Sequence, residues 1–424
     1  MSKIEDLIRQ FCPDGVEYVK LDEMGSFYSG LSGKSKEDFR DGNAKFITYV
    51  NIFNNPALKT DVEDKVKIAD GEKQNTIQYG DLLFTGSSET PDECGMCSVL
   101  THHTDENLYL NSFCFGFRFN DLSDKCPSFM KHLFRSTSIR KKICKTANGV
   151  TRYNISKKEF AKLEIPLPPL PVQEAIVNIL DRFTVYAAEL QAELQARQQQ
   201  YEYYRDTLLS FEGREDVQWK KLGELCPLIT KQTGFDYSNY IKDKLVREKK
   251  ENHIPYIQTK FFTGRQFDFN TDYYIPEETA ARFPKIVLDT KCILLSIVGA
   301  SIGNIGLYDN SQKSFLGGAI GVAKPSADVN TEFIYYYLTS HSGQKQIFHK
   351  VKGAGQATIT IEDIREFLVP QPSLSEQQRI VDILDRFDTL VNDLTQGLPA
   401  EIEARQQQYE YYRDQLLTFK RKEA

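Results

Sequence analysis

The sequence is poor in cysteine and has no long apolar run. Eight cysteines in 424 residues are too few for a disulfide framework, which fits a reducing compartment. The most apolar stretch, residues 292–308, is interrupted by Ser296, Ser301 and Asn304, so it lacks the pattern of a membrane span. The first residues have neither the basic start nor the apolar centre of a secretory leader. We therefore expect a cytoplasmic protein with no membrane partner.

The rest of the composition is that of an ordinary globular protein. Hydrophobic residues make up 40% and charged residues 26% of the chain, and its length predicts two or three domains. The 53 Lys and Arg residues stand against 59 Asp and Glu residues, which gives a net charge of -6. Since the whole chain is acidic, a polyanionic partner would have to be met by a local basic patch.

No catalytic or cofactor motif is complete in the sequence. Gly33-Lys34 lacks the glycine that a phosphate-binding loop places five positions earlier. Residues 299–306 lack the Gly-x-Gly start of a dinucleotide site, and we favour a turn between strands there. Cys94 and Cys97 form a single Cys-x-x-Cys pair, which is weak evidence for zinc even with His102, His103 and Cys114 nearby. We expect a non-catalytic chain with no cofactor and no metal.

Comparison of the chain with itself reveals a duplicated tail. Residues 196–206 and 404–414 both read ARQQQYEYYRD, and residues 176–183 return almost unchanged as residues 380–387. The upstream blocks are offset by 204 positions and the downstream blocks by 208, so one copy carries four extra residues between them. Each half of the chain is thus a long variable region, which we call a head, followed by a nearly invariant tail.

Each tail has the heptad pattern of a helix that pairs with another helix. Apolar side chains alternate in steps of four and three from Ile176 to Phe211 and again from Ile380 to Phe419. An extra step of four at Leu398 is a stutter, and the adjoining Gly397 and Pro399 predict a kink or a short interruption. The simplest assembly pairs the two tails antiparallel, with the heads at opposite ends.

Proline-rich stretches at residues 166–171 and 370–372 mark where the tails begin. We predict an α+β protein in which two mixed α/β heads alternate with two long antiparallel helices that form a coiled coil, as an internal pseudo-two-fold repeat. The boundaries are head 1 at 1–165, helix 1 at 166–213, head 2 at 214–369 and helix 2 at 370–424. Within the heads we expect strands at 46–50, 81–85, 113–119, 254–257 and 292–298, and helices at 128–144 and 331–350.

Similar tails beside divergent heads predict two copies of one partner on the tails and two different ligands on the heads. The alternative is a recent duplication of the tail alone, although the seam would still pair the tails. The candidate partner-binding residues are the aromatic and basic side chains of the repeated block, Tyr201, Tyr203, Tyr204, Arg205, Tyr409, Tyr411, Tyr412 and Arg413.

Basic charge gathers at corresponding places in the two heads. Residues 1–124 hold 12 basic and 22 acidic side chains, whereas residues 125–158 hold 10 basic and no acidic ones. Residues 333–361 again contain no Asp or Glu. A solvated helix face normally interleaves acidic residues, so these stretches favour contact with a phosphate backbone. The candidates are Lys131, Arg135, Arg140, Lys141, Lys142, Lys145, Lys345, Lys350 and Lys352.

Each basic stretch ends in a small polar loop, at residues 149–154 and 353–358. Arg152, Asn154 and Gln356 in these loops are residue types suited to base edges. A plain surface turn is the equally good alternative. We therefore treat the three residues as candidates for reading DNA sequence.

The repeat and its motifs resemble the specificity subunits of type I restriction-modification enzymes. The resemblance rests on the Pro-rich entry to each tail, the Ile-Val-x-Ile-Leu-Asp-Arg-Phe block, the Tyr-Glu-Tyr-Tyr-Arg-Asp block and their duplication, and it covers essentially the whole chain. It implies two target-recognition domains, each of which reads one half of a bipartite, asymmetric site in double-stranded DNA.

The resemblance also implies a set of protein partners. Two methyltransferase subunits would dock on the helices, and two translocating nuclease subunits would join for cleavage. The chain would then be the non-catalytic subunit of a DNA adenine methyltransferase and ATP-dependent endonuclease. The rival hypothesis is a tandem coiled-coil adaptor that scaffolds two identical proteins and does not bind nucleic acid.

Overall fold

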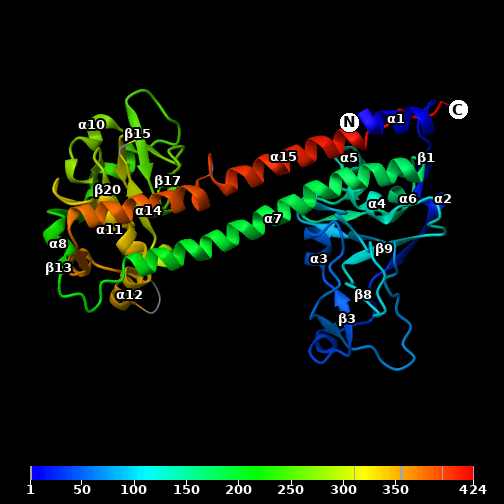
Figure 1. Cartoon of the computed structure of the whole chain (residues 1–424), viewed down its shortest axis with the longest axis horizontal. Helices are drawn as coiled ribbons and strands as arrows, with labels where there is room; N and C mark the ends of the chain where they lie inside the picture. The colour runs from blue at the N-terminus through cyan, green and yellow to red at the C-terminus, as the bar shows by residue number, and fades with distance from the viewer. Residues whose placement is uncertain (1, 310, 354–356, 394, 424) are drawn as a thin grey trace. The chain divides into compact units, whose positions relative to one another are not determined.

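The computed structural model describes residues 2–309, 311–353, 357–393 and 395–423, which form two compact units (Figure 1). The first unit comprises residues 1–191 and 401–424, and the second comprises residues 192–400. The long helix α7, Leu170–Leu208, runs from the first unit into the second. Each unit therefore contains one head together with segments of both tails.

An antiparallel sheet of four strands forms the centre of the first head. Its order is β2 (Gly25–Ser29), β9 (Cys114–Phe119), β5 (Leu82–Thr85) and β7 (Cys97–Val99). Alternate side chains of a strand face opposite sides, so Phe84 enters one core cluster and Leu83 another. The cluster around Phe84 includes Ile176 and Leu180 of α7, which anchors the start of the tail in the head.

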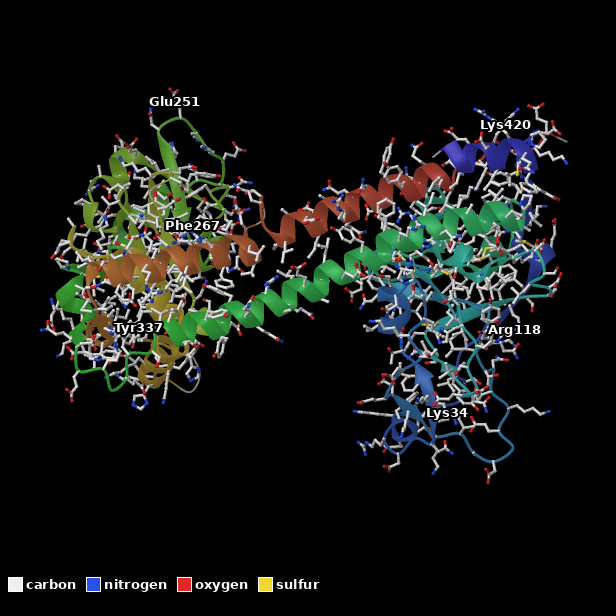
Figure 2. The ribbon with its side chains drawn as sticks, in the orientation of Figure 1. Lys34, Arg118, Glu251, Phe267, Tyr337 and Lys420 are labelled. Atoms are coloured by element: carbon white, nitrogen blue, oxygen red, sulfur yellow. The ribbon has the colours of Figure 1, made fainter. Side chains whose placement is uncertain are left out.

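An ion pair between Arg118 of β9 and the buried Asp81, which precedes β5, links the strands of this sheet. Arg118 donates from Nε and Nη2 to the two carboxylate oxygens of Asp81, at 2.9 and 2.6 Å, and the Tyr28 hydroxyl donates to the same carboxylate at 2.7 Å. Figure 2 labels Arg118 in the first unit. Because Asp81 is almost fully buried, this bidentate arrangement replaces the water that its charge would otherwise need. Burial and the neighbouring Asp81 charge raise the pKa of Tyr28, so its hydroxyl stays protonated.

Smaller elements complete the first head. A three-stranded sheet has the order β4 (Lys65–Val66), β3 (Ala44–Ile47) and β8 (Tyr109–Leu110), and a second has the order β10 (Ala147–Asn148), β11 (Tyr153–Ile155) and β6 (Ser87–Ser88). The helices are α1 (Ser2–Phe11), α2 (Leu21–Met24), α3 (Tyr49–Asn54), α4 (Pro127–Leu133), α5 (Thr137–Cys144) and α6 (Lys157–Ala161).

The second head is built on two sheets of four strands. One has the order β14 (Leu228–Lys231), β23 (Ile320–Lys324), β20 (Cys292–Ser296) and β21 (Ile305–Tyr308). The other has the order β18 (Tyr274–Pro276), β15 (His253–Ile257), β22 (Ser314–Leu316) and β19 (Val287–Leu288). One core cluster contains Leu294 of the first sheet and Phe315 of the second, so it joins the two sheets.

The remaining elements of the second head are short. A hairpin pairs β16 (Phe262–Thr263) with β17 (Gln266–Phe267). The helices are α8 (Leu222–Leu225), α9 (Gly234–Asp236), α10 (Glu277–Ala280), α11 (Thr331–Thr339), α12 (His341–Lys350) and α13 (Ile361–Arg365). Each head closes on an antiparallel pair just before its tail, β1 (Tyr18–Lys20) with β12 (Glu164–Pro166) and β13 (Gln218–Lys221) with β24 (Leu368–Gln371).

The predicted mixture of strands and helices is confirmed, with two local differences. Four of the five predicted strands, at 81–85, 113–119, 254–257 and 292–298, overlap strands of the structure. The strand expected at 46–50 ends earlier, at Ile47. The chain turns into α3 there because the Thr48 hydroxyl accepts a hydrogen bond from the Asn51 backbone nitrogen at 3.3 Å, which caps the helix.

The second difference is a break in each of the two predicted helices. Ser136 separates α4 from α5, and Ser340 separates α11 from α12. Each serine has an extended backbone, and its hydroxyl donates to the carbonyl three residues earlier, at 2.7 Å in the first head and 2.6 Å in the second. This bond competes with helix continuation. Both heads therefore turn at positions 204 residues apart.

The tails are helical and pair as expected. The second tail consists of α14 (Leu374–Asn392) and α15 (Leu398–Leu416), so the predicted interruption beside Gly397 is confirmed. In the first unit Phe183 stacks on Tyr412 at 5.4 Å between ring centroids, and the Tyr186 hydroxyl donates to Glu401 at 3.0 Å. Since the later α7 residue meets the earlier α15 residue, the pairing is antiparallel. Within the part of the chain that the structure describes, no helix has the length and apolar character needed to cross a bilayer.

Candidate nucleic-acid interface

A protruding hairpin in the first head carries the predicted base-reading residues. β10 and β11 pair antiparallel, with Asn148 opposite Asn154, and β11 continues the pairing onto β6, with Asn154 opposite Ser87. The turn between them begins at Gly149 with a φ of +146°, and a Cβ there would lie 2.0 Å from the Arg152 carbonyl oxygen. Only glycine fits this turn. Val150 at its tip is 88% exposed, so the loop stands out from the head.

Arg152 lies in a groove beside this hairpin. Its Nε and Nη2 atoms donate to the Ser87 hydroxyl oxygen at 3.3 and 3.2 Å, and its guanidinium lies 5.7 Å from the centroid of the Phe113 ring. The groove has a volume of about 900 Å³, and aromatic, apolar and acidic side chains line it, among them Tyr49, Val50, Phe53, Glu89, Glu93 and Phe113. Arg152 is thus an exposed cation with a fixed direction, and Asn154 is exposed on the adjoining strand.

Two of the predicted phosphate contacts are exposed cations on the first head. Lys141 in α5 and Lys145 just after it are exposed, and neither forms an ion pair with any residue that the structure describes. Lys142 is partly engaged, because its Nζ donates to the Glu164 carbonyl at 3.2 Å and lies 5.5 Å from the centroid of the Tyr18 ring. Burial lowers the pKa of Lys142.

Three other basic residues of the same stretch have internal partners. Arg135 donates to the carbonyls of Cys97, Ile52 and Phe53 at 2.7 to 2.9 Å, and Arg140 donates to those of Cys94 and Asp92 at 2.7 and 2.8 Å. Lys131 forms an ion pair of 2.7 Å with Asp181 of α7. Burial lowers the pKa of both arginines, that of Arg135 to about 10.

These bonds fasten loops and the tail to the head. The guanidiniums of Arg135 and Arg140 would have to exchange them to reach a phosphate, so we leave Lys131, Arg135 and Arg140 out of the interface proposed below. The sequence gives the charge of a residue, but it does not show whether the side chain points to solvent or into the protein.

The second head also pairs the residues at the corresponding positions. Lys352 and Thr358 exchange two backbone hydrogen bonds of 2.9 Å, and Thr358 also bridges to Val298. Lys352 and Thr358 stand 204 positions after Asn148 and Asn154, and Gly353 has a φ of +101° where Gly149 has +146°. Lys345 is exposed, Lys350 is half-buried, and Lys352 lies 3.1 Å from Asp363. Gln356 lies outside the described residues.

The repeated tyrosines of the tails do not share one environment. Tyr201 is 8% exposed and lies against Phe387, whereas Tyr203 is 67% and its counterpart Tyr411 61% exposed. Tyr204 stacks on Phe387 as Tyr412 stacks on Phe183, each with a centroid distance of 5.4 Å.

The other repeated residues pack on the heads or pair with neighbours. The Tyr409 hydroxyl lies 2.9 Å from His132 Nδ1, and Arg205 and Arg413 each bond the following aspartate at 3.1 Å. Of the eight predicted partner-binding residues, only Tyr203 and Tyr411 are more than half exposed.

Sequence reasoning missed an apolar groove between the paired helices. In the first unit it has a volume of about 320 Å³, and its lining is Ile179, Arg182, Phe183, Tyr186, Arg405 and Gln408. The α7 residues of this lining correspond to residues 204 positions later, and the α15 residues correspond to residues 208 positions earlier. These counterparts in the second unit are Ile383, Arg386, Phe387, Leu390, Arg197 and Gln200. Arg405 donates to Gln408 at 3.0 Å, as Arg197 donates to Gln200 at 2.9 Å. Reading the two sequence offsets together would have shown that five of these six lining residues are repeated in the sequence.

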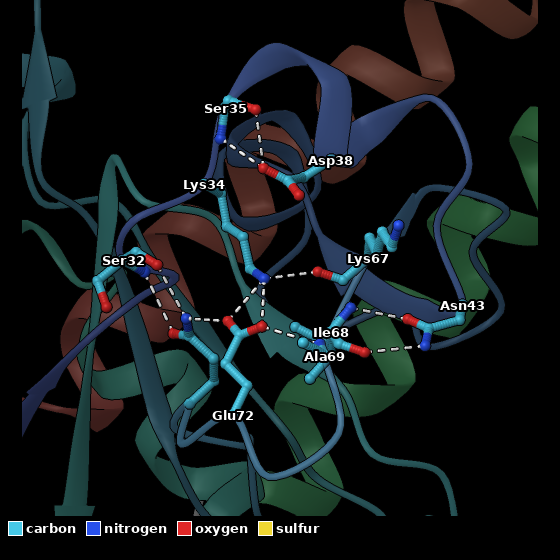
Figure 3. Close-up of polar contacts among 10 residues, drawn as sticks. Ser32, Lys34, Ser35, Asp38, Asn43, Lys67, Ile68, Ala69 and Glu72 are labelled. Atoms are coloured by element: carbon cyan, nitrogen blue, oxygen red, sulfur yellow. Dashed lines mark hydrogen bonds and ion pairs between the residues drawn. The ribbon is translucent and has the colours of Figure 1, made fainter.

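The glycine-lysine pair that resembles a phosphate loop has an internal role. Figure 2 labels Lys34 in the first unit, and Figure 3 shows its ammonium between Glu72 and the Lys67 carbonyl, each at 2.6 Å. The hydrogen bond from Lys34 is the main cause that holds the pKa of Glu72 at about 2. Lys34 therefore ties its own segment of the chain to the loop that contains Lys67 and Glu72.

The cysteine and histidine candidates are dispersed. The Cys94 thiol donates to the Tyr153 carbonyl at 3.2 Å, His102 bonds Thr60 at 3.0 Å and His103 stacks on Tyr79. Among the described residues no group of three His, Cys, Asp or Glu side chains could hold a metal ion.

Comparison with known proteins explains the repeat. The family model for the type I restriction modification DNA specificity domain matches residues 13–197 and again residues 214–404. The chain belongs to the family of type I specificity subunits. The two matched segments each contain one head and most of the tail that follows it, so the duplicated domain is a head together with its tail.

Relatives of this specificity subunit are found in several bacteria. It is 38% identical over 277 residues to a type I restriction enzyme specificity subunit of Escherichia coli, an alignment that covers 63% of this chain and 66% of that one, just under two thirds. It is 30% identical over 281 residues to a putative type I specificity subunit of Haemophilus influenzae, covering 64% of this chain and 68% of that one.

Solved structures support the same fold. The S subunit of a type I restriction-modification system from M. genitalium superposes with a TM-score of 0.51 at 17% identity, over 95% of this chain and 96% of that one. A chain from a structural study of the assembly and conformational transition of the type I system superposes with a TM-score of 0.61 at 18% identity, over 95% and 97%.

Proposed function

We propose that this specificity subunit reads a bipartite, asymmetric site in double-stranded DNA, with one head for each half-site, and carries two methyltransferase subunits on its tails. The observation that carries the proposal is a repeated attachment of divergent heads to matching tails. Asp181 of the first tail bonds His132 at 2.6 Å, and Asp385 of the second tail bonds Tyr336 at 2.6 Å. Equivalent tail positions thus hold heads whose sequences differ.

The DNA-facing part of the proposal rests on the hairpins and the exposed lysines. Lys141 and Lys145 supply positive charge shortly before the protruding 149–154 loop in the chain. In the second head Lys345 lies on α12, and Lys352 pairs with Thr358 at the positions that correspond to Asn148 and Asn154. Cations of this kind position a protein on the phosphate backbone, while side chains at a loop tip reach base edges. Because residues 149–154 and 353–358 differ in sequence, the half-sites should differ.

The partner-facing part rests on the tails. The groove that contains Phe183 and Tyr186 and the exposed Tyr203 and Tyr411 offer apolar and aromatic surface, which is enriched in protein interfaces. The sequence offsets repeat most of these lining residues in the second unit, which supports a second copy of the same partner there. We further propose that two nuclease subunits join this assembly for cleavage.

Sequencing of modified bases in cells that contain the subunit and its methyltransferase tests the proposal. We expect one motif with two unlike halves around an unread spacer. A gel shift with the assembled complex discriminates against the adaptor hypothesis, which predicts no DNA binding. The purified chain alone should transfer no labelled methyl group from S-adenosylmethionine to DNA, and transfer above background would contradict the non-catalytic role.

A further inference from the structure

We infer that Arg152 reads a guanine in the half-site of the first head, and that Ser87 positions its guanidinium for this contact. The inference rests on the proposed function and deepens it by naming a base and the residues that select it. Arginine forms two parallel hydrogen bonds with the O6 and N7 atoms of guanine in the major groove, which is the commonest specific contact of proteins with DNA.

The guanidinium of Arg152 is oriented but not saturated. It has five N–H donors, of which the structure engages one from Nε and one from Nη2 with the Ser87 oxygen. Among the residues that the structure describes, no carboxylate lies within ion-pair distance of it. This differs from Arg135 and Arg140 of the same basic stretch, whose donors bond several internal carbonyls. Arg152 therefore keeps donors for a ligand.

The support beneath Arg152 is rigid. Ser87 pairs with Asn154 in the β6 and β11 ladder, two residues from Arg152, and the Gly149 turn fixes the other end of the loop. Phe113, which is exposed, lies with its ring beneath the guanidinium. An arginine held by a hydroxyl and an aromatic ring loses less side-chain entropy on binding than a free one, because part of its freedom is already gone.

The charge of the surrounding groove favours a base over a phosphate. Glu89 and Glu93 line the same groove, and Glu93 is held by a 3.0 Å hydrogen bond from the Ser88 hydroxyl. These two carboxylates of the groove repel a phosphate, whereas base edges present neutral donors and acceptors, including the cytosine amino group, which can donate a hydrogen bond to a carboxylate. The exposed Val50 and Phe113 add apolar surface of the kind that contacts base edges.

The pairing of a serine hydroxyl with an arginine, as in Ser87 and Arg152, is a feature of the first head. In the second head Thr358 pairs with Lys352 and also bridges to Val298. Val298 thus takes the place that Ser87 has opposite Asn154, and it has no hydroxyl. A selection that depends on Ser87 and Arg152 should therefore affect one half-site only. The other half-site then serves as an internal control in every experiment.

Sequencing of modified bases with Arg152→Gln and Arg152→Lys complexes tests the inference. Removal of the bidentate interaction should reduce discrimination at a single G·C pair of one half-site by roughly 5- to 150-fold. Lysine keeps the charge but not the fork, so it should also relax that base pair. Ser87→Ala should relax the same base pair by a smaller factor, and Ser87→Thr, which keeps the hydroxyl, should preserve it. Arg40→Gln is the matched control, because Arg40 is an exposed arginine of the first head that pairs with Glu37 and does not line this groove.

The outcomes separate this inference from the function on which it rests. A wild-type complex that gives no two-part motif would overturn the proposed function. A wild-type complex that gives such a motif, with Arg152→Gln and Arg152→Lys both methylating it unchanged, would overturn the inference alone. Uniformly weaker binding of all sequences by purified Arg152→Lys and Arg152→Gln complexes, with a lower salt slope for Gln, would show a phosphate contact and would also overturn it.

Discussion

Asp206, near the end of α7, accepts a hydrogen bond of 2.9 Å from the backbone nitrogen of His341, the first residue of α12. Asp414, 208 positions later, accepts one of 3.0 Å from the nitrogen of Thr137, the first residue of α5. In both cases a tail carboxylate satisfies an unpaired donor at a helix N-terminus, where the helix dipole favours negative charge. The end of each tail thus fastens a helix in the head of the other half.

We expect Asp206→Ala and Asp414→Ala each to lower the free energy of unfolding by about 1 kcal/mol, the usual cost of removing such a cap. The asparagine variants should lose less, because the amide oxygen still accepts a hydrogen bond. Urea unfolding of the purified chain measures the difference. Glu202→Ala, at an exposed position of α7, is the control and should change stability by less than about 0.5 kcal/mol, as is usual for surface sites. Equal effects of all three changes would contradict the capping role.

The bond of Asp414 also predicts a pH dependence. Burial raises the pKa of Asp414, but hydrogen bonds from Thr137 and Arg413 outweigh it and hold this pKa below its ordinary value. A carboxyl whose pKa is lower in the folded state stabilises the fold above its unfolded pKa, and this contribution is lost as the pH falls through the folded pKa. Asp414→Asn should therefore flatten the acid limb of the stability profile, which urea midpoints measured at a series of pH values below about 4 would show.

The tails were predictable because their constraints are local and repeated. Heptad spacing predicts the seam that places Phe183 against Tyr412, and Gly397 with Pro399 predicts the interruption before α15. The basic stretch was visible in the same way. The sequence did not predict which of these basic residues are exposed and which are bonded internally. Arg140 and Lys141 are neighbours in sequence, yet Arg140 bonds internal carbonyls and Lys141 is exposed. That outcome depends on which loops fold over α5, and counting charges along the sequence gives no information about those loops.

Docking of the methyltransferase should depend on the outward tyrosines. Tyr203→Ala should weaken one of two docking events and Tyr411→Ala the other, because these side chains are equivalent and exposed. The double variant should weaken both. Light scattering of the assembled complex would show the effect as a fall in the number of partners per chain. Tyr201→Ala is not a useful probe, since Tyr201 is buried against Phe387. One partner per wild-type chain would refute the two-partner proposal.

Phosphate binding by the exposed lysines predicts a change in salt dependence. Lys141→Ala combined with Lys145→Ala should weaken binding to all DNA sequences equally and reduce the salt slope by about 0.9 for each phosphate that the variant no longer neutralises. Binding titrations of the complex at several salt concentrations measure this slope. Lys162→Ala, which removes a lysine already paired with Glu159, is the matched control. A change in base preference at constant slope would mean that these lysines read bases.

The length of α7 is a candidate measure of the spacer between the half-sites. This helix contains a tandem tetrapeptide, Ala188-Glu-Leu-Gln191 followed by Ala192-Glu-Leu-Gln195. Four residues correspond to about 6 Å of helix and to slightly more than one turn. If the helices set the spacing between the half-sites, deleting residues 192–195 should keep both half-site sequences and shorten the unread spacer by about one or two base pairs, since a base-pair step is about 3.4 Å.

The phase of the helix supplies the control for this experiment. Deleting four residues keeps the apolar seam close to its original face, whereas deleting only residues 194–195 turns the following helix by about 200° and removes the seam from its partner. The first variant should therefore fold and methylate, and the second should lose stability and assembly. Sequencing of modified bases reads the spacer directly. A four-residue deletion that methylates with the parental spacer would show that the helices hold the heads without measuring the distance between the sites they read.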